Sequence, residues 1–206
     1  MNKTVLEPRL QDLLQSLRSE IFKALNVAKP GVITSFDPAT KVAMVQILDK
    51  RILPNGSTPS YPEIECPVFT LQGGGGAIQF PIQAGDQCLI LFADRNLDNW
   101  FGNGLQNPPR DARCHDLSDG ICLVGLNPLT SAMDDYQADT ARWFYGGMEI
   151  AFNDGKVTIQ NDAESLTAVL TDLLTILSTM SSASITAGTT QAALGALIPR
   201  LLLVMY

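Results

Sequence analysis

The sequence predicts a mainly β fold with helical additions: an N-terminal helix, a closed five-stranded barrel, and a β-hairpin with a C-terminal helical segment that form a trimeric shaft. Three observations carry this prediction. Apolar residues recur with a helical period near the N-terminus, with a strand period through the middle of the chain, and with a heptad period in the last third.

The composition indicates a folded protein that does not bind nucleic acid. Of the 206 residues, 46% are hydrophobic and 17% are charged, which is ordinary for a chain that buries a core. The chain has 14 Lys and Arg against 21 Asp and Glu, and no segment is basic enough to bind along the phosphate backbone of a nucleic acid. No continuous apolar signal region follows Met1, and no stretch has the roughly 18 apolar residues of a membrane span, so we expect a protein that is soluble when made and is not exported by a cleaved signal.

The first segment, residues 1–29, is predicted to be an amphipathic helix. From Leu6 to Leu25 apolar residues stand three or four positions apart, with polar residues between them. We expect the helix to stop at Lys29-Pro30-Gly31, because proline cannot continue a helix and disfavours the helical conformation of the residue before it.

Residues 30–127 are predicted to form the barrel. A short helical turn at 96–100, capped by Asn96, precedes the last strand, an arrangement that favours a barrel of the OB type. We expect Gly73–Gly76 to form a bulge or corner, and Trp100 and Phe101 to plug one end. The expected strands are residues 32–36, 41–48, 64–71, 87–92 and 121–126.

The part after the barrel begins with a predicted acidic linker, residues 128–146, which contains Asp134, Asp135 and Asp139. Residues 148–152 and 156–160 then alternate apolar and polar positions around Asn153-Asp154-Gly155, which predicts a hairpin. Because an isolated hairpin is only marginally stable in water, we expect residues 147–206 to find partners in a trimeric shaft.

A heptad pattern supports that trimer. Leu at a with Ile or Val at d favours three or four helices over two. The alternative is a helix that folds back on the barrel of its own chain. The expected trimer interface consists of Leu166, Val169, Leu173, Ile176 and Met180 at a and d, with Leu170 and Leu177 at e.

The C-terminal segment is apolar, and exposed apolar patches of that size are rare on soluble monomers. We therefore expect it to contact a tip protein or a partner subunit. The expected contact residues are Leu194, Leu197, Leu201, Leu203 and Tyr206.

No catalytic, cofactor-binding or metal-binding constellation is predicted. The one histidine, His115, stands between Cys114 and Asp116, and neighbours on an extended chain point to opposite faces. We therefore expect His115 and Asp116 to anchor a loop. The four cysteines lie too far apart in sequence for a typical zinc site, and we expect them to be buried thiols of a protein made in a reducing compartment.

Several short motifs occur in a fixed order along the barrel segment. They are Gly31-Val32, Asp37-Pro38, Gly75-Gly76, Phe80-Pro81, Ala84-Gly85-Asp86, Cys88-Leu89, Phe92-Ala93-Asp94-Arg95, Asn99-Trp100 and the run from Arg113 to Gly120. Over roughly residues 9–126 this order resembles the N-terminal OB domain of the central spike proteins of contractile-tailed bacteriophages.

The resemblance implies a structural protein without enzymatic activity. In that family three chains form a needle, the OB domains make a collar that docks beneath the tail hub, and contraction drives the needle through the host outer envelope. It implies assembly in the host cytoplasm and a place in the virion baseplate, with the hub protein and, transiently, the host outer membrane as partners.

Relatives often end in a β-helix with an iron-binding His-x-His tip, whereas this chain has a single histidine. We therefore expect a short shaft without a cofactor, and a separate tip protein is a candidate partner.

Two other functions stay open at this stage. One is an OB-fold binding module for oligosaccharide or another tail protein, without a piercing role. The other is an enzyme that acts on cell-wall glycan, which requires two carboxylates facing a cleft.

Overall fold

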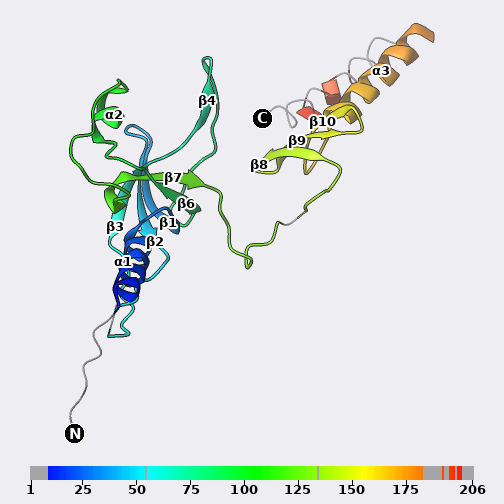
Figure 1. Ribbon diagram of the computed structural model, residues 1–206. Coiled ribbons are helices and arrows are strands. Elements are labelled where there is room, and N and C mark those ends of the chain that lie inside the picture. The colour runs from blue at the N-terminus through cyan, green and yellow to red at the C-terminus, as the bar shows by residue number, and fades with distance from the viewer. Residues whose placement is uncertain are drawn as a thin grey trace. The chain divides into compact units, whose positions relative to one another are not determined.

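The computed structural model describes residues 9–53, 55–133, 135–182, 192, 195–197 and 199–200, without the side chains of residues 178–182 (Figure 1). The chain divides into two compact units, Met1–Ala132 and Met133–Tyr206. The fold is mainly β, as predicted, with a few helices.

The N-terminal helix, α1 (Leu10–Ala24), is confirmed, but the predicted stop is wrong. The helix ends at Ala24, because Leu25 already has extended backbone angles. Pro30 instead lies in strand β1 (Ala28–Asp37), opposite Leu89. A proline fits there because the pairing of β1 with β2 begins only at Gly31, so the missing N–H interrupts no ladder on that side, while the carbonyl accepts the N–H of Leu48 at 3.0 Å.

All five predicted barrel strands are present, in one antiparallel sheet of order β3-β2-β1-β6-β7 (Figure 1). Phe69 N–H donates to the carbonyl of Cys122 at 2.9 Å, beside an isolated bridge between Val68 and Cys122. The edge strands β3 and β7 thus meet at one point, and the sheet forms a curled half-barrel rather than the fully closed barrel that we expected. This arrangement fits an OB-like fold. Besides β1 the strands are β2 (Val42–Ile47), β3 (Glu63–Pro67), β6 (Gln87–Phe92) and β7 (Gly120–Val124).

The half-barrel encloses one apolar core. Buried and less buried residues alternate along β2, as expected for a strand with one face toward the core. Two glycines permit the close packing inside: a Cβ on Gly31 would lie 2.6 Å from Val45 Cγ1, and a Cβ on Gly120 would lie 2.9 Å from Cys66 Sγ. The buried members are Ile33, Ala43, Val45, Ile47, Ile64, Cys66, Val68, Cys88, Ile90, Phe92 and Cys122.

The four glycines that we expected in a bulge or corner instead form the tip of a separate hairpin. Strands β4 (Leu71–Gly73) and β5 (Gly76–Ile78) pair antiparallel, with Leu71 opposite Ile78. Gly74 and Gly75 at the tip have φ values of 58° and 86°. Two consecutive positive φ values define the type I′ turn of a two-residue hairpin, which glycine adopts without strain.

The second insertion, between β6 and β7, contains helix α2 (Asp98–Asn103) and the short 3₁₀ helix η1 (Leu117–Asp119). Helix α2 starts two residues later than predicted, although Asn96 Oδ1 does accept the N–H of Asp98 at 2.9 Å. Trp100 and Phe101 are about half exposed, so they do not plug the barrel end.

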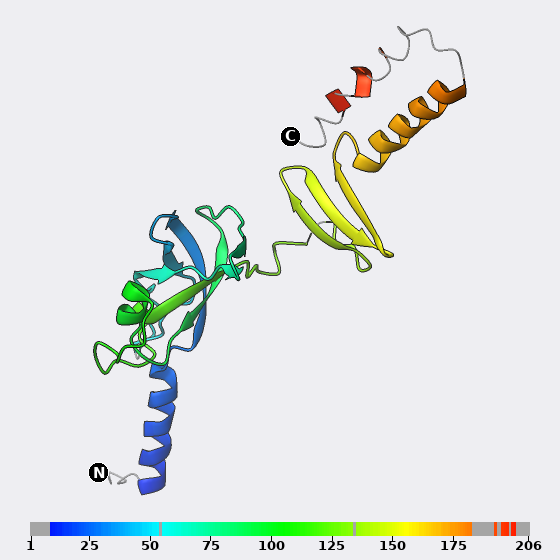
Figure 2. The same cartoon turned by 90° about the horizontal axis from the view of Figure 1, so that it is seen from above.

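The second unit contains a three-stranded antiparallel sheet of order β10-β9-β8 (Figure 2). Strands β9 (Met148–Asn153) and β10 (Lys156–Asn161) confirm the predicted hairpin, with positive φ at Asp154 and Gly155 in its turn. Strand β8 (Ala141–Tyr145) lies where we expected only linker, in residues 128–146. The turn Gly146-Gly147 returns the chain from β8 into β9, which makes a third strand possible.

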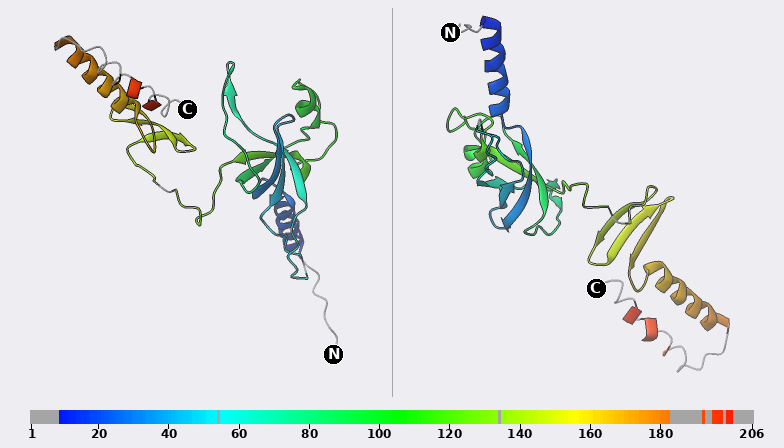
Figure 3. Two further views of the ribbon diagram at one scale, coloured as in Figure 1. Left: turned by 180° about the vertical axis from the view of Figure 1, so that it is seen from behind. Right: turned by 90° about the horizontal axis from the view of Figure 1, so that it is seen from below.

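Helix α3 (Leu166–Ser182) follows β10 (Figure 3). Ser165 caps this helix, because its Oγ accepts the N–H of Ala168 at 3.1 Å. Asn161 Oδ1 accepts the N–H groups of Ala163 and Glu164 in the preceding turn.

The close packing at Gly31 gives a direct test of the half-barrel core. We expect Gly31→Ala to lower the free energy of unfolding by about 2 kcal/mol, because the added methyl overpacks the space next to Val45 and Ile90. Chemical denaturation followed by circular dichroism measures the effect. Gly102→Ala is the matched control. Gly102 lies in helix α2, and a Cβ at this position meets nothing within 4 Å. Equal stability of the two variants would contradict the packing described above.

Candidate functional site

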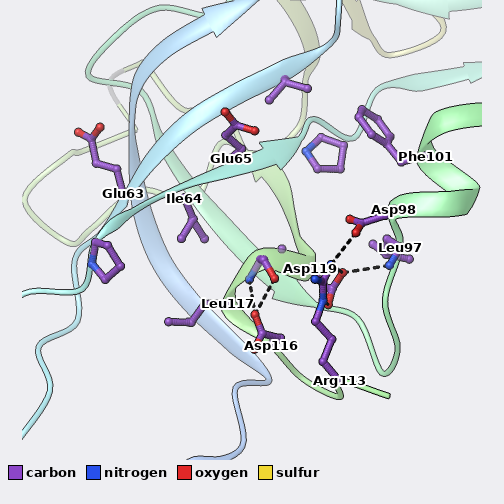
Figure 4. A pocket seen from close by; sticks show the side chains of 15 residues that line it. Glu63, Ile64, Glu65, Leu97, Asp98, Phe101, Arg113, Asp116, Leu117 and Asp119 are labelled. Carbon is purple, nitrogen blue, oxygen red and sulfur yellow. Dashed lines mark hydrogen bonds and ion pairs between the residues drawn. The ribbon is translucent and has the colours of Figure 1, made fainter. Parts of the chain in front are cut away.

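A pocket of about 560 Å³ lies between β3, α2 and η1 (Figure 4). Ile64, Phe101 and Leu117 give it an apolar lining, and it holds several carboxylates. These carboxylates could take part in a reaction only if ion pairs and hydrogen bonds within the protein do not already occupy them. The charged lining residues are Glu63, Glu65, Asp98, Arg113, Asp116 and Asp119.

Both carboxylate oxygens of Asp119 are used in hydrogen bonds within the protein. Its buried carboxylate accepts Arg113 Nε at 2.8 Å, Arg113 Nη2 at 3.1 Å and the backbone N–H of Leu97 at 2.9 Å (Figure 4). The hydrogen bond from Arg113 to Asp119 raises the pKa of the guanidinium. This two-point ion pair ties the segment before β7 to the start of α2.

The neighbouring carboxylates also hold the loop. Asp116 accepts both the N–H and the hydroxyl of Ser118, at 2.9 and 2.6 Å, and these hydrogen bonds lower the pKa of Asp116. Asp98 lies 3.0 Å from Arg113 Nη2. Three of the pocket's carboxylates therefore position its walls, a use that leaves them poorly suited to transfer protons.

His115 lies beside this network without joining Cys114. Its Nε2 is 3.4 Å from Asp94 Oδ1, and its carbonyl accepts Asn26 Nδ2 at 3.0 Å. Cys114 Sγ instead accepts Arg95 Nη1 at 2.8 Å. The prediction of a loop anchor therefore holds for Asp116 and for the backbone of His115, while the His115 side chain contributes only the long contact to Asp94.

The cysteines differ from the prediction at one position. Cys66, Cys88 and Cys122 are buried free thiols, and burial raises the pKa of Cys66 to about 12, whereas Cys114 is exposed. Within the described part of the chain, no group of three or more His, Cys, Asp or Glu side chains is placed to hold a metal ion. Nor is any described helix both long enough and apolar enough to cross a bilayer.

A second candidate site is the apolar face of the three-stranded sheet, which α3 covers at Ile159 and which is exposed at Trp143 and Tyr145. The strand register places Trp143, Ile150 and Ile159 side by side on one face, with Phe152 of the same face in edge contact with Trp143 at 5.8 Å between ring centroids. Trp143 is 60% exposed and Tyr145 is 68% exposed. The sequence reasoning missed this face, although Trp143 and Tyr145 two residues apart were its signal.

The opposite face of the same sheet is mostly polar, although it also holds Phe144, which is 67% exposed and whose ring centroid lies 5.4 Å from the Arg142 guanidinium carbon. Arg142 Nε donates to Glu149, and Gln160 Nε2 donates to Glu149 Oε2 at 3.2 Å, so one carboxylate joins all three strands. The contact with Arg142 lowers the pKa of Glu149. One face of the sheet therefore combines a hydrogen-bonded network with a single exposed aromatic residue, and the other gathers Trp143, Tyr145 and Phe152. The second face is the better suited to bury against a partner.

The predicted trimer residues of α3 separate into two stripes. Val169 is buried and packs with Leu166, Leu173 and Ile176, while Leu170 and Leu177 are nearly half exposed. Leu174, which the heptad reasoning left out, is 67% exposed and continues the stripe of Leu170 and Leu177. The side chain of Met180 lies outside the described residues.

One predicted tip contact, Leu197, packs against Val169 in its own chain. Arg200 strengthens that attachment, because its Nε donates to Glu164 Oε2 at 2.7 Å and its Nη1 donates to Asp172. The hydrogen bond from Arg200 lowers the pKa of Glu164. The other predicted tip contacts lie outside the described residues; they are Leu194, Leu201, Leu203 and Tyr206.

The ion pair at Asp119 generates a stability prediction. Asp119→Asn removes the charge opposite the partly buried Arg113, so we expect the free energy of unfolding to fall by about 2–3 kcal/mol. Asp111→Asn is the control, because it removes a more exposed partner of the same arginine and should cost less than about 1 kcal/mol. Urea denaturation of both variants measures the difference, and equal losses would show that Asp119 does not hold the loop.

Comparison with known proteins assigns a family likeness to the half-barrel. Residues 29–125 match the family model described as phage protein Gp138 N-terminal domain. The match spans β1 to β7 with both insertions, slightly less than half of the 206 residues, and leaves α1 and the second unit outside. No curated protein matches the chain. The match supports a phage structural protein family and suggests a virion component.

Proposed function

We propose that this protein is the homotrimeric central spike of a phage tail baseplate, which docks beneath the tail hub and punctures the host outer envelope during contraction. The family match of residues 29–125 supports a phage structural role, and the ordered motifs of the half-barrel resemble the collar domain of such spikes.

The observation that carries the proposal is the apolar surface that one copy leaves uncovered in the second unit. Trp143, Tyr145 and Val157 are each more than half exposed on one sheet face. An aromatic side chain buries roughly 150–250 Å² when it is fully covered. The two aromatic residues and their neighbours thus exceed the scattered exposure usual for a soluble monomer, and we infer that other copies cover them.

Three copies account for this surface better than two. Leu at a and Val or Ile at d of the α3 heptads favour higher-order helix association. Leu197 of the same chain covers part of that a/d face, so the exposed stripe of Leu170, Leu174 and Leu177 is the α3 surface that neighbours would contact first. In a symmetric shaft, three sheets with aromatic faces inward exclude water from each other.

The proposed role is mechanical and involves no catalysis, cofactor or nucleic acid. A collar holds the shaft to the hub protein, sheath contraction supplies the force, and the host outer membrane is a transient contact. A separate protein at the C-terminal end is proposed to complete the tip. The expected place of the assembled protein is the virion tail baseplate, after assembly in the host cytoplasm.

The assembly state tests the proposal. We expect the full chain to run as a trimer of about 67 kDa, three times the chain mass of 22.2 kDa, in size-exclusion chromatography with light scattering. Leu170→Asp with Leu177→Asp should shift it toward monomer, because two charges then enter the buried seam.

The matched control is Thr171→Asp with Thr175→Asp, which adds the same charge at exposed positions of the same helix. We expect the control to stay trimeric, with unchanged helix content in circular dichroism. A wild-type chain that is monomeric at every concentration would exclude the spike, and a trimer that survives the leucine changes would exclude the α3 seam.

The second candidate is a binding module for oligosaccharide or another tail protein. Phe101 lines the pocket beside β3, and it and its neighbour Trp100 are about half exposed, so aromatic surface is available for a sugar to stack on. Calorimetric titration with cell-surface oligosaccharides separates the two candidates: saturable binding that is lost in Phe101→Ala favours the module. Release of soluble fragments from peptidoglycan would instead show an enzyme.

A further inference from the structure

The hairpin of β4 and β5 carries an apolar face that its own chain leaves exposed. Residues 69–80, here named the ribbon, alternate apolar and polar positions on both sides of the glycine tip. Leu71 and Ile78 are directly opposite each other, and Phe69 and Phe80 stand two residues further along the two arms. All four are exposed, from 46% for Ile78 to 63% for Phe80.

The ribbon has little to stabilise it within one copy. Its strands pair with each other and form a two-stranded sheet of their own, which projects from the half-barrel (Figures 1 and 3). Two-stranded hairpins are marginally stable in water without further packing. A defined ribbon with an apolar face therefore indicates that something packs against that face.

The ribbon also lacks the charges that usually protect exposed strand edges. No Asp, Glu, Lys or Arg occurs between Glu65 and Asp86, although charged residues make up 17% of the chain. Exposed edges are commonly protected by charged side chains, above all lysine. An uncharged, apolar and projecting hairpin has the composition of a buried contact rather than of a solvated loop.

We propose that the apolar face of the ribbon docks on a second copy of this chain. The proposal rests on the homotrimer proposed above and places an additional contact between the half-barrel units. The lack of charge in the ribbon suits a second copy as the occupant: each chain carries a net charge of -7, and two like-charged copies repel each other least where they meet through an uncharged segment.

The size of the ribbon fits a ring of copies better than a dimer. Four side chains that are about half exposed offer roughly 400 Å², about half of what one partner contributes to a stable interface. In a closed ring each copy gives its own ribbon and receives another, so each copy takes part in two such contacts.

Cysteine labelling tests whether a neighbour covers the apolar face. In a Cys114→Ser background, which removes the exposed native thiol, Leu71→Cys probes the apolar face and Gln72→Cys probes the polar face. We expect maleimide to modify Leu71→Cys at least tenfold more slowly than Gln72→Cys in the assembled protein, and equally fast after dilution to monomers. Equal rates in the assembly, or protection that appears only when another tail protein is added, would overturn the proposal.

A second measurement separates this proposal from the spike itself. Leu71→Ser with Ile78→Ser should raise the concentration at which the trimer half-dissociates by at least tenfold, while Gln72→Ser with Gln79→Ser should leave it unchanged. Unchanged circular dichroism of the monomers shows that both pairs fold. A wild-type monomer would overturn both proposals, whereas a trimer sensitive to the Leu170 and Leu177 changes but not to the ribbon changes would overturn this one alone.

Discussion

The half-barrel depends on how closely its backbone and side chains approach each other at Gly31 and Gly120. Strand β1 is the centre of the sheet, with β2 and β6 on its two sides, and the absence of a side chain at Gly31 lets Val45 and Ile90 fill the interior. At Gly120, the start of β7, the absence of a side chain likewise makes room for Cys66 and Ile90. The curl of the sheet, and with it the meeting of β3 and β7, requires this tight interior.

Outside that core, the two insertions serve different purposes. The segment between β6 and β7 is fixed to the core by the pair of Arg113 and Asp119, and Asp116 shapes its last turn. The ribbon between β3 and β6 has no comparable polar anchor, and its apolar residues point to solvent. One insertion therefore completes the domain, while the other leaves its apolar residues uncovered.

The sequence predicted the elements whose period was clear and missed those whose signal was mixed. Alternation, or an apolar run of strand length at residues 87–92, identified all five strands of the half-barrel, and alternation identified the hairpin of β9 and β10. Strand β8 was missed because three aromatic residues run consecutively from Trp143 to Tyr145 beside an acidic segment, which hides the alternation. The four glycines were ambiguous, because a bulge and a hairpin tip both need positive φ, and only pairing across the turn distinguishes them. For α3 the heptad predicted which residues share a face, but not that Leu197 of the same chain covers part of it, because that contact spans a long stretch of sequence.

The attachment of the C-terminal segment to α3 adds a free-energy cost to the association of copies that we propose. Leu197 occupies the stripe around Val169, and Arg200 fastens it through Glu164 and Asp172. A helix from another copy that packs on the same residues must first displace Leu197 from them. These ion pairs are only partly buried, and pairs that solvent and salt can reach are weak, so the attachment is reversible. In the trimer that we propose, a neighbouring helix would replace this intramolecular cover, and the local concentration of copies would set when the exchange occurs.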